Sequence, residues 1–286
     1  MRLQRLGPYD LSKIPVEIAQ QSATDSDNQV KYVLTNYEAF LNDRNNIVFS
    51  VHQTDWNSVI NVVRFVRVDT SLRHKFAKER EWGALTPAKS RIPSIFCLHA
   101  VVSFEDDSLL VLKRDSSLEF SDGKLSLSFE EQLSDTDFKV GGDVDSVGWW
   151  VRRAICEEVF PLRSKFKEQP EQAWHLANDK VRDIKIWSLI FEEELAGWAL
   201  TVHIRLDMPS GQFVSVYRQI QQFSGDTRDS EGDFALLGRA ELRRLIQDGK
   251  ATVQSLSAQK AWHIGVEQLH PTALYRALTF DRLLAN

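Results

Sequence analysis

The 286-residue sequence contains only two cysteines, Cys97 and Cys156. Two cysteines exclude the disulfide framework of a small secreted domain, and without a Cys-x-x-Cys pattern or a Cys/His cluster the sequence predicts no zinc site. No apolar run approaches the roughly 18 residues of a membrane-spanning helix. The N-terminal stretch also lacks the apolar core of a signal peptide. We therefore expect a reduced, cytoplasmic protein without a membrane partner.

The sequence also lacks an excess of positive charge, since its formal net charge is -5. This charge argues against a general nucleic-acid partner and against an anionic membrane surface. The phosphate-binding motifs of P-loop and Rossmann proteins are absent, and so is the Gly-x-Ser-x-Gly motif of serine hydrolases. The remaining composition, with 43% hydrophobic and 26% charged residues, is ordinary for a globular protein.

The first part of the chain, residues 1–93, predicts a small N-terminal α/β region of unknown function. Residues 30–41 have helical spacing, and residues 47–51 are typical of a strand. Residues 59–68 fit either a strand or a buried helix. The stretch 86–93 contains two prolines and breaks the pattern, so we place a domain boundary there and assign residues 94–286 to the main domain.

In the main domain, strand patterns alternate with helical ones. Apolar runs predict strands at 96–104, 109–114, 125–129, 184–191, 199–206 and 234–237. Helical spacing predicts helices at 143–161, 170–181, 239–247 and 273–284, the last of them capped by Thr272. Residues 213–223 fit either type. This order predicts an α/β fold, namely an α/β sandwich with a mixed sheet and helices on its faces.

The helix at 143–161 differs from the others because two adjacent acids, Glu157 and Glu158, lie at its C-terminal end. Its buried stripe is expected to be Val147, Val151, Ala154, Ile155 and Val159. The helix macrodipole favours cations at the C-terminal end, so a bound cation would offset the cost of the two acids. The alternative is a solvated edge on which Arg153 and Glu157 form an i, i+4 pair worth only tenths of a kcal/mol. Both interpretations stay open on the helix pattern alone.

The same helix resembles the second half of the box of the Nudix hydrolase family, Arg-Glu-U-x-Glu-Glu-x-Gly-U, in which U is aliphatic. Arg153, Ile155, Glu157 and Glu158 match this pattern. The earlier Glu of the box falls on Asp145, which is a conservative replacement. The motif itself is short, whereas the order of the strands extends the resemblance over residues 94–286. It implies a Nudix-like α/β/α sandwich.

Two positions depart from the family pattern. Ala154 stands where the box has a Glu, and Phe160 stands where it has a Gly. In the family the Glu at the first of these positions is a metal ligand or general base, and alanine can be neither. Hydrolysis then needs a substitute acid, for which Glu130, Glu131 and the run 192–194 are candidates. Among these we select Glu131.

The resemblance implies a Mg²⁺-dependent (or Mn²⁺-dependent) hydrolase that splits a diphosphate linkage in a nucleotide derivative. In such an enzyme carboxylates and retained water molecules hold the ion, which neutralises charge on the phosphate oxygens. Glu157, Glu158 and Asp145 would be the metal ligands, and Glu157, Glu158 and Glu131 the catalytic residues. Arg153 is assigned to the substrate-binding side, where it would hold one of the paired acids by a charge-assisted hydrogen bond.

Three further residues are assigned to the phosphates of the substrate. Gly142 belongs to a Gly-Gly pair whose backbone N–H groups can approach a phosphate, although such a pair is also common in plain turns. Lys113 and Arg114 end a predicted strand. Their charges fit a phosphate contact, with plain solvation as the alternative.

The alternative to the hydrolase is a Nudix-like fold that has lost catalysis and binds a nucleotide-type ligand or a protein partner, a second copy of the chain (a homodimer) included. Ala154 and Phe160 favour this alternative, whereas the retained Arg153, Glu157 and Glu158 favour the hydrolase. On the sequence alone, the question whether the chain is an enzyme stays open.

Overall fold

The computed structural model describes residues 1–10, 30–39, 47–71, 74, 94–114, 124–138, 146–192, 195–225, 232–256 and 261–285, with the backbone alone at 36–39, 114, 232, 233 and 285. The chain divides into two compact units. The first comprises Met1–Leu98, Gln132–Val151 and Leu189–Leu200, and the second comprises His99–Glu131, Arg152–Ser188 and Thr201–Asn286. The domain boundary expected near residue 93 stays a prediction.

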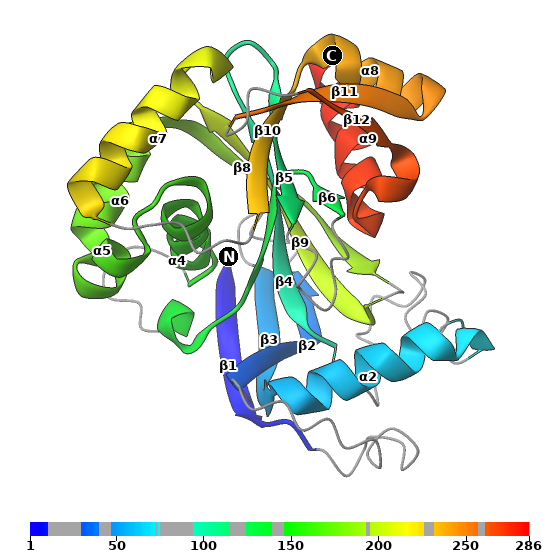
Figure 1. Cartoon of the computed structure of the whole chain (residues 1–286). Helices are drawn as coiled ribbons and strands as arrows, with labels where there is room; N and C mark the ends of the chain where they lie inside the picture. The colour runs from blue at the N-terminus through cyan, green and yellow to red at the C-terminus, as the bar shows by residue number, and fades with distance from the viewer. Residues whose placement is uncertain are drawn as a thin grey trace. The chain divides into compact units, whose positions relative to one another are not determined.

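In the described part of the first unit, three strands form a sheet with the order β1-β3-β2 (Figure 1). β1 (Arg2–Pro8) runs parallel to β3 (Ile47–Asp55), while β2 (Val30–Ala39) runs antiparallel to it. One pair of each kind makes this a mixed sheet. The helix expected at 30–41 is wrong, because these residues pair with β3 as a strand.

Burial explains why the strand overrides the helical spacing. Tyr32, Val33 and Leu34 follow one another in β2, and all three are buried. Successive side chains of a strand point to opposite faces, so both faces of β2 are covered here. Helical spacing in a sequence is recognised by a single apolar face. A strand that is buried on both faces has apolar residues at many positions, so some of them also fall at helical spacing.

Helix α2 (Trp56–Val68) follows β3 directly and decides between the two structures left open for residues 59–68. The Asp55 side chain caps its N-terminus by accepting a hydrogen bond from the Ser58 N–H at 2.9 Å. The buried residues of the helix are Val59, Ile60, Val62, Val63 and Val66. The β-branched run thus forms the buried stripe of an amphipathic helix.

Within the described residues a larger sheet has the strand path β12-β11-β10-β5-β4-β9-β8, while β6 pairs with β5 and β7 pairs with β4. Its strands are β4 (Phe96–Ser103), β5 (Leu109–Arg114), β6 (Leu125–Ser126), β7 (Phe129–Gln132), β8 (Val181–Glu192), β9 (Gly197–Leu206), β10 (Gly232–Leu237), β11 (Lys250–Ser255) and β12 (Ala261–Gly265). The pairs β4/β5, β5/β10, β10/β11 and β11/β12 are antiparallel. Together with its helices, this sheet makes the protein α/β, as the sequence predicts.

The single strand expected at 125–129 is split between β6 and β7. Residues 125–129 are all buried, so their alternation of apolar and polar side chains does not mark an exposed face. The serines tolerate burial because they have partners. Ser128 Oγ accepts a hydrogen bond from the Val102 N–H at 2.8 Å, and the Ser126 hydroxyl donates to Glu130.

Most helices agree in type with the sequence expectations. The confirmed ones are α6 (Pro170–Asn178), α8 (Arg239–Asp248) and α9 (Pro271–Ala285). Residues 213–223, left open between strand and helix, belong to α7 (Ser210–Ser224). Helix α5 (Arg163–Glu168) and strands β11 and β12 have no counterpart among the expectations. None of the described helices combines the length and apolar character needed to cross a membrane.

The hydrophobic core of the second unit includes residues of both α8 and α9. Its buried members are Val101, Leu109, Val111, Leu125, Leu127, Ala235, Leu237, Leu242, Leu245, Ala251, Val253, Ile264, Leu269, Ala273, Ala277 and Phe280. Burying one Leu, Val or Phe side chain fully contributes about 1.5–3 kcal/mol. Because α9 packs into this core, polar groups on its inner face are removed from water and need protein partners.

Candidate functional site

Strand β7 carries two adjacent acids, Glu130 and Glu131, whose side chains enter different polar clusters. Successive side chains of a strand point to opposite faces, so the two carboxylates diverge. Glu131 pairs with Arg153 at 2.8 Å, and Glu130 pairs with Arg276 at 2.5 Å. One short strand therefore supplies a carboxylate to each of two clusters.

The motif helix consists of α4 (Ser146–Ala154) and a π-helical turn, η3 (Ile155–Val159), which carries the paired acids. The Phe160 N–H donates to the Ile155 carbonyl at 3.1 Å, as the wider π turn requires. Phe160 has an extended backbone and ends the helix. The expected stripe is buried, namely Val147, Val151, Ala154, Ile155 and Val159. Single π turns inside helices are rare in proteins. Where they do occur, they are often located at functional sites.

An acid–arginine cluster surrounds the end of this helix, and it consists of Glu131, Arg153, Glu157, Glu158 and Arg163. Arg153 Nη1 donates to Glu131 Oε1 at 2.8 Å and to Glu157 Oε2 at 3.2 Å. Arg163, the first residue of α5, places Nε 3.6 Å from Glu157 Oε2 and Nη2 3.3 Å from Glu158 Oε1. Each acid of the motif therefore has a guanidinium partner.

The acids of this cluster are largely removed from solvent. The exposed fraction is 9% for the Glu157 side chain and 3% for the Glu158 side chain. Burial raises the pKa of Glu157 above its ordinary value of 4.5, while the Arg153 and Arg163 charges oppose this rise and the Glu131 carboxylate adds to it. Three carboxylates and two guanidinium groups leave a formal charge of -1 when all are ionised.

The described residues of the acid–arginine cluster do not fit a bound Mg²⁺ ion as they stand. Ala154 is fully buried and offers no ligand atom, and the acids are already paired with guanidinium groups. Among the described residues, the group whose possible ligand atoms lie within 4.8 Å of one another is His99, Glu130 and His270. The acids around Arg153 do not form such a group.

The structure shows no contact between the acid–arginine cluster and the other site residues predicted from the sequence, as far as these residues are described. Lys113 lies on β5, and its ammonium group is 5.3 Å from the centroid of the Trp262 ring. No contact within the described residues joins Lys113 to the acid–arginine cluster. For Arg114 the backbone alone is described, and Gly142 and Asp145 lie outside the described residues.

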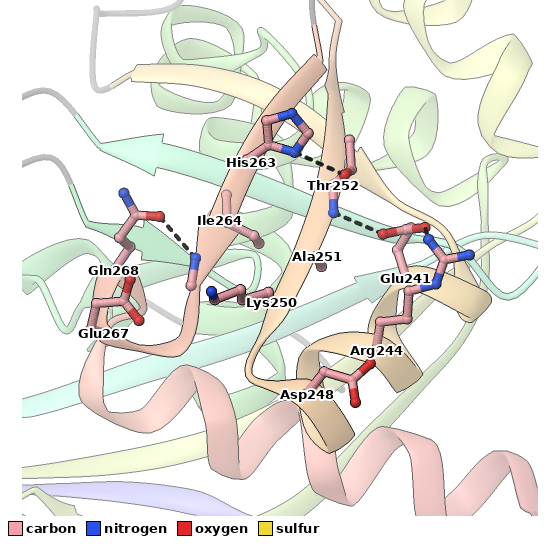
Figure 2. Close-up of a pocket in the computed structure, with 11 residues that line it drawn as sticks. Glu241, Arg244, Asp248, Lys250, Ala251, Thr252, His263, Ile264, Glu267 and Gln268 are labelled. Carbon is pink, nitrogen blue, oxygen red and sulfur yellow. Dashed lines mark hydrogen bonds and ion pairs between the residues drawn. The ribbon is translucent and has the colours of Figure 1, made fainter.

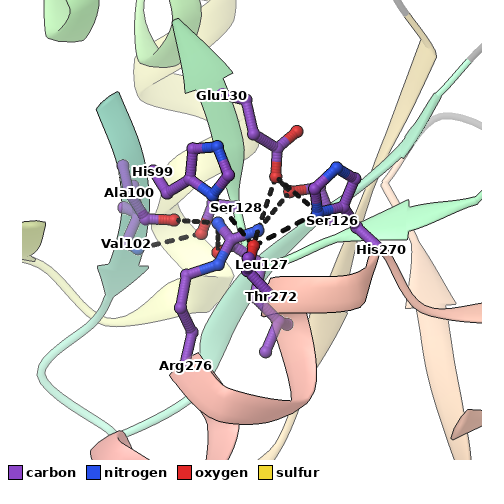
Figure 3. Close-up of polar contacts among 10 residues, drawn as sticks. All are labelled: His99, Ala100, Val102, Ser126, Leu127, Ser128, Glu130, His270, Thr272 and Arg276. Carbon is purple, nitrogen blue, oxygen red and sulfur yellow. Dashed lines mark hydrogen bonds and ion pairs between the residues drawn. The ribbon is translucent and has the colours of Figure 1, made fainter. Parts of the chain in front are cut away.

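A histidine–glutamate cluster lies on the Glu130 side of β7, and it consists of His99, Glu130, His270, Thr272 and Arg276 (Figure 3). His99 belongs to β4, and His270 directly precedes α9. The Thr272 hydroxyl is 2.8 Å from His99 Nδ1 and 3.2 Å from His270 Nδ1. His270 Nδ1 is 3.9 Å from Glu130 Oε1. Three elements of the second unit thus converge on a few polar atoms.

Arg276 holds this cluster from the inner face of α9, and its exposed fraction is 0%. It donates to the Ala100 carbonyl at 2.9 Å, to the Leu127 carbonyl, to Ser126 Oγ at 3.2 Å and to Glu130 Oε1 at 2.5 Å. A buried guanidinium is tolerated when its charge is paired, as Glu130 pairs the charge of Arg276 here. One side chain therefore ties α9 to β4 and to the segment around β6 and β7.

Sequence reasoning did not find this second cluster. Thr272 is the second residue of α9 rather than the expected cap, and its hydroxyl serves the two histidines instead. Glu130 and Arg276 are separated by 146 positions, so no local pattern connects them. His99 and His270 likewise come from a strand and from the start of a distant helix. The convergence has no sequence signal, because strand pairing and helix packing create it.

A pocket of about 500 Å³ is formed by α8, β11, β12 and the short helix η4 (Val266–Gln268) (Figure 2). Its charged lining residues are Glu241, Arg244, Asp248, Lys250 and Glu267. Arg244 pairs with Glu241 at 2.5 Å, whereas Lys250 has no ion-pair partner among the described residues. The pocket contains no member of the acid–arginine cluster or of the histidine–glutamate cluster.

No protein-family model matches this chain, and a comparison with curated proteins finds no match either. The resemblance to Nudix hydrolases therefore depends on Asp145, residues 153–158 and the order of strands and helices, and it stays a prediction. The structure adds the surroundings of the motif acids, which decide what those acids can do.

Proposed function

We propose that the chain is a Nudix-like module that binds a nucleotide-type ligand, and that its motif helix no longer holds a catalytic metal ion. The pairing of the motif acids with two arginines carries this proposal. Arg153 lies 3.2 Å from Glu157, and Arg163 lies 3.3 Å from Glu158. Carboxylates that hold Mg²⁺ must share the ion with water molecules and substrate phosphates, and these two carboxylates are almost fully buried.

Charge competition supports the same conclusion. A Mg²⁺ ion would have to displace guanidinium groups, and arginine does not lose its charge in proteins. Separating one partner from a buried ion pair costs about 3–5 kcal/mol. Mg²⁺ also retains several water molecules, which need space beside the carboxylate. Glu158, with 3% of its side chain exposed, offers little such space.

The pocket formed by α8, β11, β12 and η4 supports the binding part of the proposal. Its volume of about 500 Å³ lies within the range of about 300–1,000 Å³ found for small-molecule sites. Lys250 forms no ion pair within the described residues, so its ammonium group is the lining cation that a phosphate could contact, although Glu241, Asp248 and Glu267 line the same pocket. The nucleotide class of the ligand follows from the resemblance to the Nudix family.

A second candidate function is the Mg²⁺- or Mn²⁺-dependent hydrolase. The raised pKa of Glu157 and its place in a π turn favour this candidate, because perturbed carboxyl groups and π turns are both frequent at functional sites. In this candidate Glu157 and Glu158 hold the ion together with Asp145, and Glu131 replaces the missing acid at Ala154. The ion would supply charge neutralisation at the diphosphate.

Phosphate release from a panel of nucleoside diphosphate derivatives, with Mg²⁺ or Mn²⁺, separates the two candidates. We expect the wild-type rate to equal the rate without protein, and Glu157→Gln and Glu158→Gln to behave in the same way. At least one compound of the panel should raise the melting temperature without added metal. Metal-dependent release that is present in the wild type and lost in both variants would refute the binding module and support the hydrolase.

The site of binding is tested by Lys250→Gln. Losing one charge-assisted contact to a phosphate should weaken binding about tenfold, which corresponds to about 1.4 kcal/mol. Lys185→Gln is the matched control, because Lys185 is 66% exposed on β8 and does not line the pocket. Equal affinity of the wild type and Lys250→Gln would remove this pocket from the proposal.

A further inference from the structure

The structure points to a metal site that is independent of the motif helix: we propose that His99, Glu130 and His270 bind a Zn²⁺ ion. Their possible ligand atoms lie within 4.8 Å of one another, although the residues come from three separate segments of the chain (Figure 3). The exposed fractions are 3% for both histidines and 8% for the Glu130 side chain. Two imidazoles and a carboxylate are ligand types that Zn²⁺ takes from proteins.

The spacing of these atoms requires only small movements. In a tetrahedral Zn²⁺ site with bonds of about 2.0–2.1 Å, neighbouring ligand atoms lie about 3.3 Å apart. His270 Nδ1 and Glu130 Oε1 are separated by 3.9 Å. No two of the possible ligand atoms are more than 4.8 Å apart. To reach the tetrahedral spacing, such a pair would have to approach by about 1.5 Å, a distance that side-chain rotation can supply. If His270 binds through Nδ1, it would exchange its hydrogen bond with Thr272 for the ion.

Thr272 prepares the two imidazoles for an ion. Its hydroxyl lies within hydrogen-bond distance of His99 Nδ1 and of His270 Nδ1. The same hydroxyl accepts a hydrogen bond from Arg276 Nη2 at 3.3 Å, so Thr272 orients both rings beside the guanidinium. An imidazole binds a metal ion in its neutral form, through the nitrogen that carries no proton. Because the hydroxyl already has three partners, the fourth position of the ion would fall to a water molecule.

Arg276 determines which ions the cluster accepts. Its guanidinium neutralises Glu130, so a divalent ion brings positive charge to a neutral group. Glu130 Oε1 already accepts from Ser126 and Arg276, so the ion would take the other oxygen of the carboxylate or compete with these two donors. Because the Glu130–Arg276 pair has no net negative charge, the affinity for a metal ion must come mainly from the imidazole nitrogens of His99 and His270. This favours Zn²⁺ over Mg²⁺, which prefers oxygen ligands.

The proposed ion would join β4 and β7 to the start of α9, so zinc content and stability are the readouts. Full-length protein is stripped with a chelator, incubated with ZnCl₂, desalted and analysed for bound zinc by mass spectrometry. We expect about one zinc ion per chain and a rise in the melting temperature with ZnCl₂ but not with MgCl₂. His270→Gln should weaken zinc binding by about 100-fold or more. His263→Gln, an exposed histidine on β12, is the matched control and should bind as the wild type does.

Two further measurements keep the test decisive if His270→Gln does not fold. Glu130→Gln removes a different ligand, and its zinc content is measured in the same way. Wild type loaded with Co²⁺ should show the visible absorption of tetrahedral coordination. The proposal is overturned if the wild type retains no zinc and shows no such absorption, or if both ligand variants bind zinc as tightly as the wild type. Because the motif acids are untouched, either result leaves the proposed ligand-binding function to its own test.

Discussion

Glu130 and Glu131 are neighbours in one strand, yet they belong to clusters of different character. Glu130 meets Arg276, a fully buried guanidinium that is also held by backbone carbonyls and hydroxyls. Glu131 shares Arg153 with a second acid, Glu157. The first cluster balances its charges when its histidines are neutral, whereas the second has one acid in excess. In this strand the two adjacent acids therefore belong to separate clusters, because successive side chains point to opposite faces.

Because the two clusters differ in charge balance, we expect them to respond differently to substitution and to pH. A balanced, buried cluster has little freedom, so losing one member leaves an uncompensated charge in the core. A cluster with an excess acid already carries an electrostatic cost, so it should respond to pH and to substitution of the acid. We expect the histidine–glutamate cluster to act mainly on stability and the acid–arginine cluster to be the more adjustable of the two.

The largest effect is expected for Arg276→Met. The substitution leaves the Glu130 carboxylate without its buried cation, and the Ala100 and Leu127 carbonyls lose a donor. We expect the free energy of unfolding to fall by about 3–5 kcal/mol, measured by urea denaturation. Arg244→Met is the control, since Arg244 is 63% exposed and should change stability by less than about 0.5 kcal/mol. A loss below about 1 kcal/mol for Arg276→Met would contradict the contrast between the clusters.

A smaller loss is expected for Arg153→Met, about 2 kcal/mol, because a charge-assisted contact is removed while Arg163 still faces Glu157. Glu157→Gln in the same chain should recover part of this loss, since it removes one of the acids that Arg153 neutralised. A double-mutant cycle measured by urea denaturation gives the coupling between the two residues. Strictly additive effects would show that the 3.2 Å contact carries no coupling energy.

The smallest effect concerns the pH dependence of stability. Burial raises the pKa of Glu157 in the folded protein, so the folded state binds this proton more tightly than the unfolded chain does. Stability then falls as the pH rises from the ordinary pKa of 4.5 through the raised one. Glu157→Gln cannot ionise and should show a flatter profile over this window, with Glu168→Gln, an exposed acid on α5, as the control. Parallel profiles of the wild type and Glu157→Gln would contradict this expectation.

The sequence by itself determined the features that depend on neighbours along one element. The strands at 96–104 and 109–114, the helix at 239–247 and the α/β class follow from local periodicity, because it marks the buried side of each element. The contact between Arg153 and Glu157 follows from their i, i+4 spacing. The same reasoning failed for β2, where burial on both faces made a strand resemble a helix.

Only the tertiary structure decided the partners of the functional side chains. It placed Glu131 on Arg153, and it brought His99, Glu130 and His270 together from three segments. It also decided that the motif acids are buried beside guanidinium groups rather than exposed. The physical reason is that strand pairing and helix packing join residues far apart in the chain. Whether a carboxylate is a metal ligand or an ion-pair partner depends on its burial and its neighbours, and local spacing encodes neither.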